Sequence, residues 1–141
     1  MSSKSKAQTE EIANEKVHNA VDSERWILGA LMLGNAESED VFDAIRPEMF
    51  FMPIHTRIFQ AILDLREAKS TFQLPDVYEQ TIKSGYTDAD PAYLASLFDE
   101  LPQVHSLEIY IKAIQRTYRM RKYVRFGSMN YGMMKPDLYR M

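Results

Sequence analysis

The chain has 141 residues, of which 45% are hydrophobic and 26% are charged, a composition typical of one globular domain rather than of a disordered segment. It contains no cysteine, which excludes disulfides and thiolate metal sites and fits a reducing compartment. No run of about 18 apolar residues is present, and the N-terminus lacks the apolar centre of a signal peptide, so we expect a cytoplasmic protein without membrane contact.

The net charge of −3 conceals an uneven distribution along the chain. Residues 1–105 carry nine Lys and Arg against eighteen Asp and Glu, whereas residues 106–141 carry eight against two. A basic end on an acidic body is compatible with contact to nucleic acid or to an acidic protein. Charge steering within an oligomer is an equally open explanation.

The first predicted element is a helix from about Ala20 to Leu33, because apolar residues return there at helical spacing. We expect Asp22, Glu24 and Arg25 to take the face opposite the apolar one. Gly34 follows directly and is suited to end the helix.

Three further helices are predicted in the middle of the chain, over about Glu37–Ile45, Pro53–Ala68 and Gln73–Ser84. Prolines mark their starts and stops, since proline suits the first turn of a helix and disfavours the helical conformation in the residue before it. The apolar segment 49–51 lies between two of them, and we expect it to plug the underside of the core.

A fifth helix is predicted after Asp90-Pro91, and a long sixth helix from the capping residue Ser106 to about Arg125. Residues 1–18 are polar and without apolar period, so we expect a flexible N-terminal tail. Residues 126–141 show no clean period either and are interpreted as a C-terminal tail or a loosely docked segment, which leaves one helical domain over residues 19–125.

These elements predict an all-α fold, a small bundle of about six short helices joined by short loops. The residues expected in its core are large and apolar and recur at helical spacing. They are Ile27, Leu28, Leu31, Phe42, Ile58, Phe59, Ile62, Leu94, Leu97 and Ile114.

The sequence offers no motif for catalysis, for a cofactor or for a metal ion. A phosphate-binding loop needs clustered glycines beside a lysine, and the five glycines are scattered, so we expect no nucleotide hydrolysis by that route. His18, His55 and His105 lie outside any metal-like spacing, and His55 is expected to pack or to form a surface hydrogen bond.

An acidic group over residues 37–43 could be mistaken for a cation site. On a helix Glu39 and Asp43 would point outward together, and hard cations need several converging oxygens, so a solvated acidic face is the preferred interpretation.

The last predicted helix carries a basic run interleaved with tyrosines. The candidate contact residues for nucleic acid or a partner are Lys112, Arg116, Arg119, Lys122 and Arg125. Phosphate or acidic-partner binding is one explanation. The favourable placement of cations near a helix C-terminus, with long side chains lying over apolar neighbours, is the other and preferred one.

The order of the segments resembles the N-terminal domain of bacterial replicative helicases of the DnaB type. The resembling segments are AVDSERWILGALMLGN, PEMFFMPIHTRIFQAILDL, LPDVYEQTIKSG, DPAYLASLFDELP and YIKAIQRTYRMRKYV. The resemblance covers about Val17 to Val124, and its most specific parts are LGALML with Glu24 before it, the pattern F-x-x-P-x-H-x-x-I-F over residues 50–59, and AYLASL.

This resemblance implies a small helical bundle that forms the collar of a hexameric helicase, pairs with its neighbours and is a docking platform for primase. In that family a separate RecA-like C-terminal domain hydrolyses ATP and unwinds DNA, and the chain has no counterpart of it. The helical hairpin that follows the bundle in the family is replaced by GSMNYGMMKPDLYRM. The resemblance therefore implies a fold and an association role, and it assigns no individual binding residue.

Two functions from different classes follow. The first is a DNA-replication protein without motor activity or cofactor, a helicase collar domain standing alone. It would be a phage- or plasmid-borne relative, a truncated gene product or one part of a split helicase. It would form a homo-oligomer and dock to replicative helicase subunits or primase. The second is a small phage- or plasmid-type accessory protein that binds single-stranded nucleic acid weakly through the basic last helix. An enzyme with an unrecognised site is a distant third.

Overall fold

The computed structural model describes the backbone of residues 20–35, 37–99 and 106–140, with side chains described as far as Val124. A first helix occupies residues 20–33 and is followed by α2 (Ser38–Ala44) and the single 3₁₀ turn η1 (Pro47–Met49). Then come α3 (Pro53–Glu67), α4 (Leu74–Lys83), α5 (Pro91–Ser96) and α6 (Glu108–Arg140). The described residues contain no strand, so the predicted all-α fold is confirmed.

The helix ends follow from local chemistry. Gly34 adopts a φ of +78°, which an L side chain rarely tolerates, and the Asn35 N–H returns to the Ala30 carbonyl at 3.1 Å to close the first helix. Gln73 and Asp76 form a reciprocal capping box at the start of α4. Asp90 caps α5 by accepting the Tyr93 N–H at 2.8 Å.

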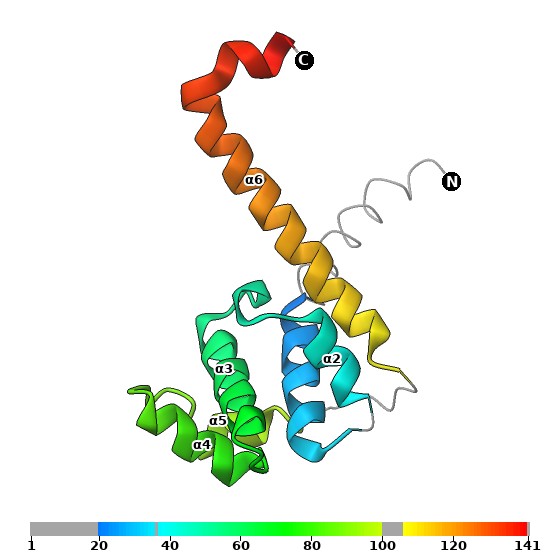
Figure 1. Cartoon of the computed structure of the whole chain (residues 1–141), viewed down its shortest axis with the longest axis vertical. Helices are drawn as coiled ribbons and strands as arrows, with labels where there is room; N and C mark the ends of the chain where they lie inside the picture. The colour runs from blue at the N-terminus through cyan, green and yellow to red at the C-terminus, as the bar shows by residue number, and fades with distance from the viewer. Residues whose placement is uncertain (1–19, 36, 100–105, 141) are drawn as a thin grey trace, which may run out of the picture.

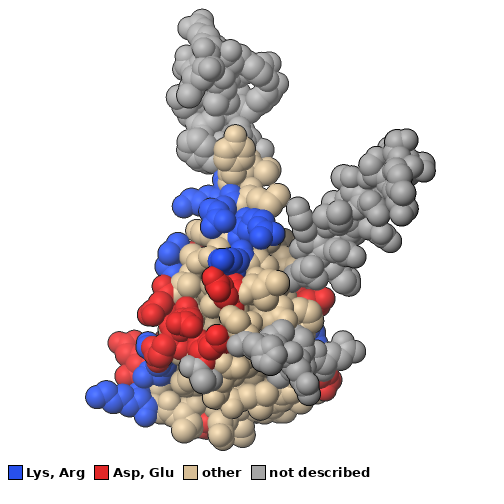
Figure 2. All heavy atoms as spheres, turned by 90° about the vertical axis from the view of Figure 1, so that its right-hand side faces the viewer, with Lys and Arg blue, Asp and Glu red and all other residues tan. Residues whose placement is uncertain are grey.

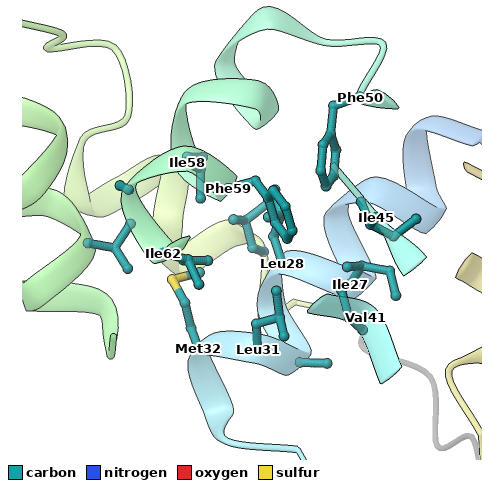
Figure 3. Close-up of a cluster of buried hydrophobic side chains, with 14 of the residues drawn as sticks. Ile27, Leu28, Leu31, Met32, Val41, Ile45, Phe50, Ile58, Phe59 and Ile62 are labelled. Atoms are coloured by element: carbon teal, nitrogen blue, oxygen red, sulfur yellow. The ribbon is translucent and has the colours of Figure 1, made fainter. Parts of the chain in front are cut away.

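The first five helices pack into a bundle, and α6 leans on one side of it and projects beyond it (Figure 1). The core lies where the first helix, α2 and α3 meet, with Leu28, Val41 and Phe59 contributed by the three elements (Figure 3). The Phe50 and Phe59 rings lie 5.0 Å apart between centroids, which closes the core beneath η1.

Most of the expected core residues are fully buried. Nine of the ten have exposed fractions of 0–1%, and the tenth, Phe42, is only partly buried because it lies at the edge of the cluster, against Phe59 and Phe72. The segment 49–51 divides: Met49 and Phe50 are buried, whereas Phe51 is 54% exposed, since it follows η1 into the surface turn before α3.

One expectation about the fold was wrong. The last helix does not end near Arg125 but continues to Arg140 through the segment expected to be a tail. Gly127 and Gly132 lower helix propensity by about 1 kcal/mol each, but they retain the backbone N–H that continues a helix. The expected tail over residues 1–18 lies outside the described residues, as do His18 and His105.

Candidate functional site

The base of α6 is attached to the bundle by an apolar inner face. Ile111 and Ile114 are 6% and 1% exposed, and they recur at helical spacing on the side that faces the first helix and α2. Tyr110 packs edge-on against Trp26 with 5.1 Å between ring centroids. This packing fixes the first turns of α6 and leaves its outer face to solvent.

Three hydrogen bonds set the direction of α6. The Leu107 N–H donates to Glu37 Oε2 at 2.8 Å, and Gln115 Nε2 donates to the Ala44 carbonyl at 3.2 Å. Farther along, Arg121 Nη2 donates to the Met49 carbonyl at 3.0 Å, and its guanidinium lies 5.3 Å from the centre of the Phe51 ring. Arg121 is therefore the outermost described anchor of the helix.

The outer face of α6 combines basic and apolar side chains. Lys112, Arg116, Arg119 and Lys122 are all exposed, and the first three follow the spacing that places residues on one face of a helix. Large apolar side chains share this exposure, with Ile109 at 66%, Met120 at 62%, Tyr123 at 80% and Val124 at 64%. The side chain of the fifth candidate, Arg125, lies outside the described residues.

The acidic residues of α2 form a second surface beside it. Glu39, Asp40 and Asp43 are exposed, and Glu39 accepts a hydrogen bond from Arg66 at 2.7 Å. Within the described residues, no group of three or more His, Asp or Glu is arranged to hold a metal ion. Figure 2 shows the acidic cluster directly below the basic cluster of α6 on one side of the molecule.

The interior of the bundle contains a polar network that the sequence interpretation missed. Glu24 was expected on the face opposite the apolar one but is 1% exposed, and its Oε1 lies 2.7 Å from Nδ1 of the fully buried His55. His55 Nε2 lies 2.7 Å from the Tyr93 hydroxyl. Glu24 also accepts the N–H groups of Phe51 at 2.6 Å and Met52 at 3.3 Å.

The hydrogen bonds fix the roles of the three side chains. A carboxylate can only accept, so the His55 Nδ1–H donates to Glu24, and in a neutral ring Nε2 then accepts the Tyr93 O–H. Burial raises the pKa of Tyr93, the charge of Glu24 adds to this effect, and the charge of Arg25 opposes it. The network joins the first helix, α3 and α5 into one unit.

Helical period could have found this network. Glu24 stands three and four residues before Ile27 and Leu28, and His55 stands in the same relation to Ile58 and Phe59. Both polar residues therefore lie on the apolar faces of their helices. Because Glu24 and His55 are sealed from solvent, the network has no open position for a substrate, and its geometry serves to hold helices together.

In the part of the chain that the structure describes, no helix is long and apolar enough to cross a bilayer.

Comparisons with known proteins agree with this geometry. The model of the family described as "DnaB-like helicase N terminal domain" matches residues 16–116. The replicative DNA helicase DnaB of Treponema pallidum is 26% identical over 111 residues, which are 75% of this chain and 25% of the helicase. That of Geobacillus stearothermophilus is 24% identical over 118 residues, 82% of this chain and 26% of the helicase.

A solved structure has the same fold. The N-terminal domain of DnaB helicase from Mycobacterium tuberculosis superposes with a TM-score of 0.72 at 24% identity, covering 80% of this chain and 81% of that one. The matched segments span only about a quarter of the length of the two helicases.

Proposed function

We propose, from the premise that the chain belongs to the family of DnaB-like helicase N-terminal domains, that it serves DNA replication as a protein-association domain. In this proposal it binds further copies of itself and docks to replicative helicase subunits or to primase. The proposal assigns no residue to nucleotide hydrolysis, since the five glycines are scattered along the sequence rather than clustered beside a lysine.

One observation carries the proposal: beyond Arg121, its outermost described anchor, α6 projects away from the bundle (Figure 1). Isolated helices are marginal in water, and in proteins their stability comes mostly from packing of one face. Just beyond Arg121, Tyr123 and Val124 expose most of their apolar surface. A second protein surface against this face would bury them and stabilise the helix.

Sedimentation equilibrium of the whole chain tests self-association. We expect assemblies of two or more copies, weakened when Met120, Tyr123 and Val124 are replaced together by Gln, which keeps helix propensity while removing apolar area. Leu33→Gln is the matched control, because Leu33 is 64% exposed like Val124 but lies on the first helix.

Docking is tested separately by a pull-down with a purified replicative helicase and a purified primase. The proposal expects at least one of them to be retained by the wild-type chain and released by the Gln variant. A chain that stays monomeric at all concentrations and retains neither protein would overturn the proposal. ATP hydrolysis by the purified chain alone would place it among the enzymes instead.

A further inference from the structure

The surface formed by α2 and α6 carries opposite charges in two adjacent areas. We define the basic surface as Lys112, Arg116, Arg119 and Lys122 of α6, and the acidic surface as Glu39, Asp40 and Asp43 of α2. All seven side chains are exposed. Figure 2 shows a group of Lys and Arg side chains above a group rich in Asp and Glu, with further Lys and Arg side chains beside the acidic group.

The residues at the centre of each surface have no charge partner among the described residues. Lys112 pairs with Glu108 at 2.9 Å and Glu39 pairs with Arg66 at 2.7 Å. Within residues 20–35, 37–99 and 106–124, Arg116 and Arg119 form no ion pair, and the same holds for Asp40 and Asp43. The side chains of Arg116, Arg119, Asp40 and Asp43 are therefore exposed to solvent without an ion-pair partner among the described residues.

The bundle holds the two surfaces next to each other without letting them neutralise one another. The Leu107 N–H bond to Glu37 and the Gln115 bond to the Ala44 carbonyl lock α6 to α2 near its base. The central arginines of the basic surface lie beyond these two attachments along α6. The intramolecular geometry thus separates the signs, and a second molecule can bring them together.

We propose that the acidic surface of one copy contacts the basic surface of a second copy, and the reverse, in a two-fold arrangement. This inference rests on the proposed self-association and assigns the surfaces that carry it. In a two-fold contact the same surface is used by both subunits, so one patch must be self-complementary. Adjacent areas of opposite sign meet that requirement when the two copies run antiparallel, because the contact between an acidic and a basic area then occurs twice in the dimer.

A second copy fits this surface better than nucleic acid does. Phosphates attracted to Arg116 and Arg119 would approach the carboxylates of α2 as well. Exposed charges more than about 8 Å apart are largely screened at physiological salt, so this repulsion acts on the phosphates that come closest to α2. The acidic surface would repel the polyanion, whereas a second copy offers charge of both signs.

Charge reversal on each surface tests the contact. Arg116→Glu with Arg119→Glu cancels the net positive charge of the basic surface, because two Glu then stand against Lys112 and Lys122. Asp40→Lys with Asp43→Lys gives the acidic surface a net positive charge, because two Lys then outweigh Glu39. Sedimentation equilibrium should show each variant self-associating at least about tenfold more weakly than the wild type at low salt. The Asp variant also brings the net charge closer to zero, so a loss of association there cannot be a net-charge effect.

Two combinations are expected to restore association. A mixture of the two variants should form a mixed dimer. In one of its two contacts, the unchanged acidic surface of the Arg variant meets the unchanged basic surface of the Asp variant. In the other contact, the introduced Glu side chains face the introduced Lys side chains. The chain that carries all four changes should self-associate more tightly than either variant alone, because its new Glu side chains at 116 and 119 face the new Lys side chains at 40 and 43 of the second copy. Lys83→Glu and Glu79→Lys on α4, on the far side of α3, are the controls and should change nothing (Figure 1).

The outcomes separate this inference from the proposed function. If neither charge reversal nor added salt changes the strength of self-association, the charge pairing is overturned. Self-association through the apolar residues of α6 would then remain. A wild-type chain that does not associate at all would overturn both. If labelled single-stranded DNA binds the wild type tightly and the Arg variant loses this binding, the basic surface binds nucleic acid. That result would overturn the proposal that a second copy binds there.

Discussion

The bundle interior and the α2–α6 surface differ in whether their polar groups find partners within the chain. Inside, Glu24 is buried and both of its oxygens accept hydrogen bonds, so the network is complete within the chain. Outside, Arg116 and Asp43 are exposed and have no charge partner among the described residues. We propose that the interior determines stability and that the surface determines association, so mutations should affect the two properties separately.

The largest expected effect comes from the buried network. Glu24→Ala removes the acceptor of the Phe51 and Met52 N–H groups and of His55, and it should lower the free energy of unfolding by about 3–5 kcal/mol, because those donors stay buried without partners. Urea denaturation followed by circular dichroism measures the loss. Glu79→Ala on α4, whose carboxylate is largely exposed, should change stability by about 0–1 kcal/mol. Equal losses would show that Glu24 holds nothing together.

Loss of apolar packing should have a similar or slightly smaller effect. Leu31→Ala empties space at the centre of the core and should cost about 2–5 kcal/mol. Leu33→Ala, two residues along the same helix, removes a side chain that is 64% exposed and should cost much less. Thermal melts of the two variants, side by side, check this ranking, and similar melting temperatures would contradict the observed face of the helix.

A smaller effect is expected from Tyr93→Phe. The change leaves His55 Nε2 buried without a hydrogen-bond partner and should cost about 1–3 kcal/mol near neutral pH. Tyr123→Phe, at an 80% exposed site, is the control and should leave the free energy of unfolding unchanged.

The pH dependence of the same variant gives a second readout. Burial raises the pKa of Tyr93 above its ordinary value of 10.0, so the folded chain binds the phenolic proton more tightly than the unfolded chain. This stability is present below about pH 10 and is lost as pH rises through the raised pKa. Tyr93→Phe should therefore lose less stability than the wild type in alkaline solution. Parallel alkaline melting curves would contradict the buried position of the phenol.

The smallest effect on stability is expected at Arg121, where α6 leaves the bundle. Arg121→Gln removes the bond to the Met49 carbonyl and the contact with the Phe51 ring, and should cost about 1 kcal/mol. The loss should be local, with faster amide hydrogen exchange in α6 and little change in the bundle. Arg119→Gln at high salt is the control, and uniform protection in both variants would show that Arg121 does not anchor α6.

The sequence predicted the elements better than their contacts. Apolar period, the prolines, Gly34 and Asp90 located the helices, because these signals are local. The course of α6 beyond Arg125 was missed, since weak propensity in that segment does not decide whether a helix continues. The charged residues of both surfaces were identified, but their adjacency depends on how α6 docks against α2, which no local pattern encodes.

The position of Glu24 shows the same limit at one residue. Its charge suggested solvent, whereas its spacing to Ile27 and Leu28 indicated the core. Glu24 is buried, as its spacing indicated, because His55 and two backbone N–H groups satisfy the hydrogen bonds of its carboxylate. Such partners come from α3 and the turn before it, far away in the sequence, and become visible only in the folded chain.

The most direct test of the separation between interior and surface is one paired measurement on Arg116→Glu with Arg119→Glu. Its mass in solution and its melting temperature are recorded at concentrations where the wild type is associated and where it is not. We expect the variant to be monomeric where the wild type is associated, with a melting temperature equal to that of the dissociated wild type. Full association of the variant, or a variant that no longer folds, would contradict the account.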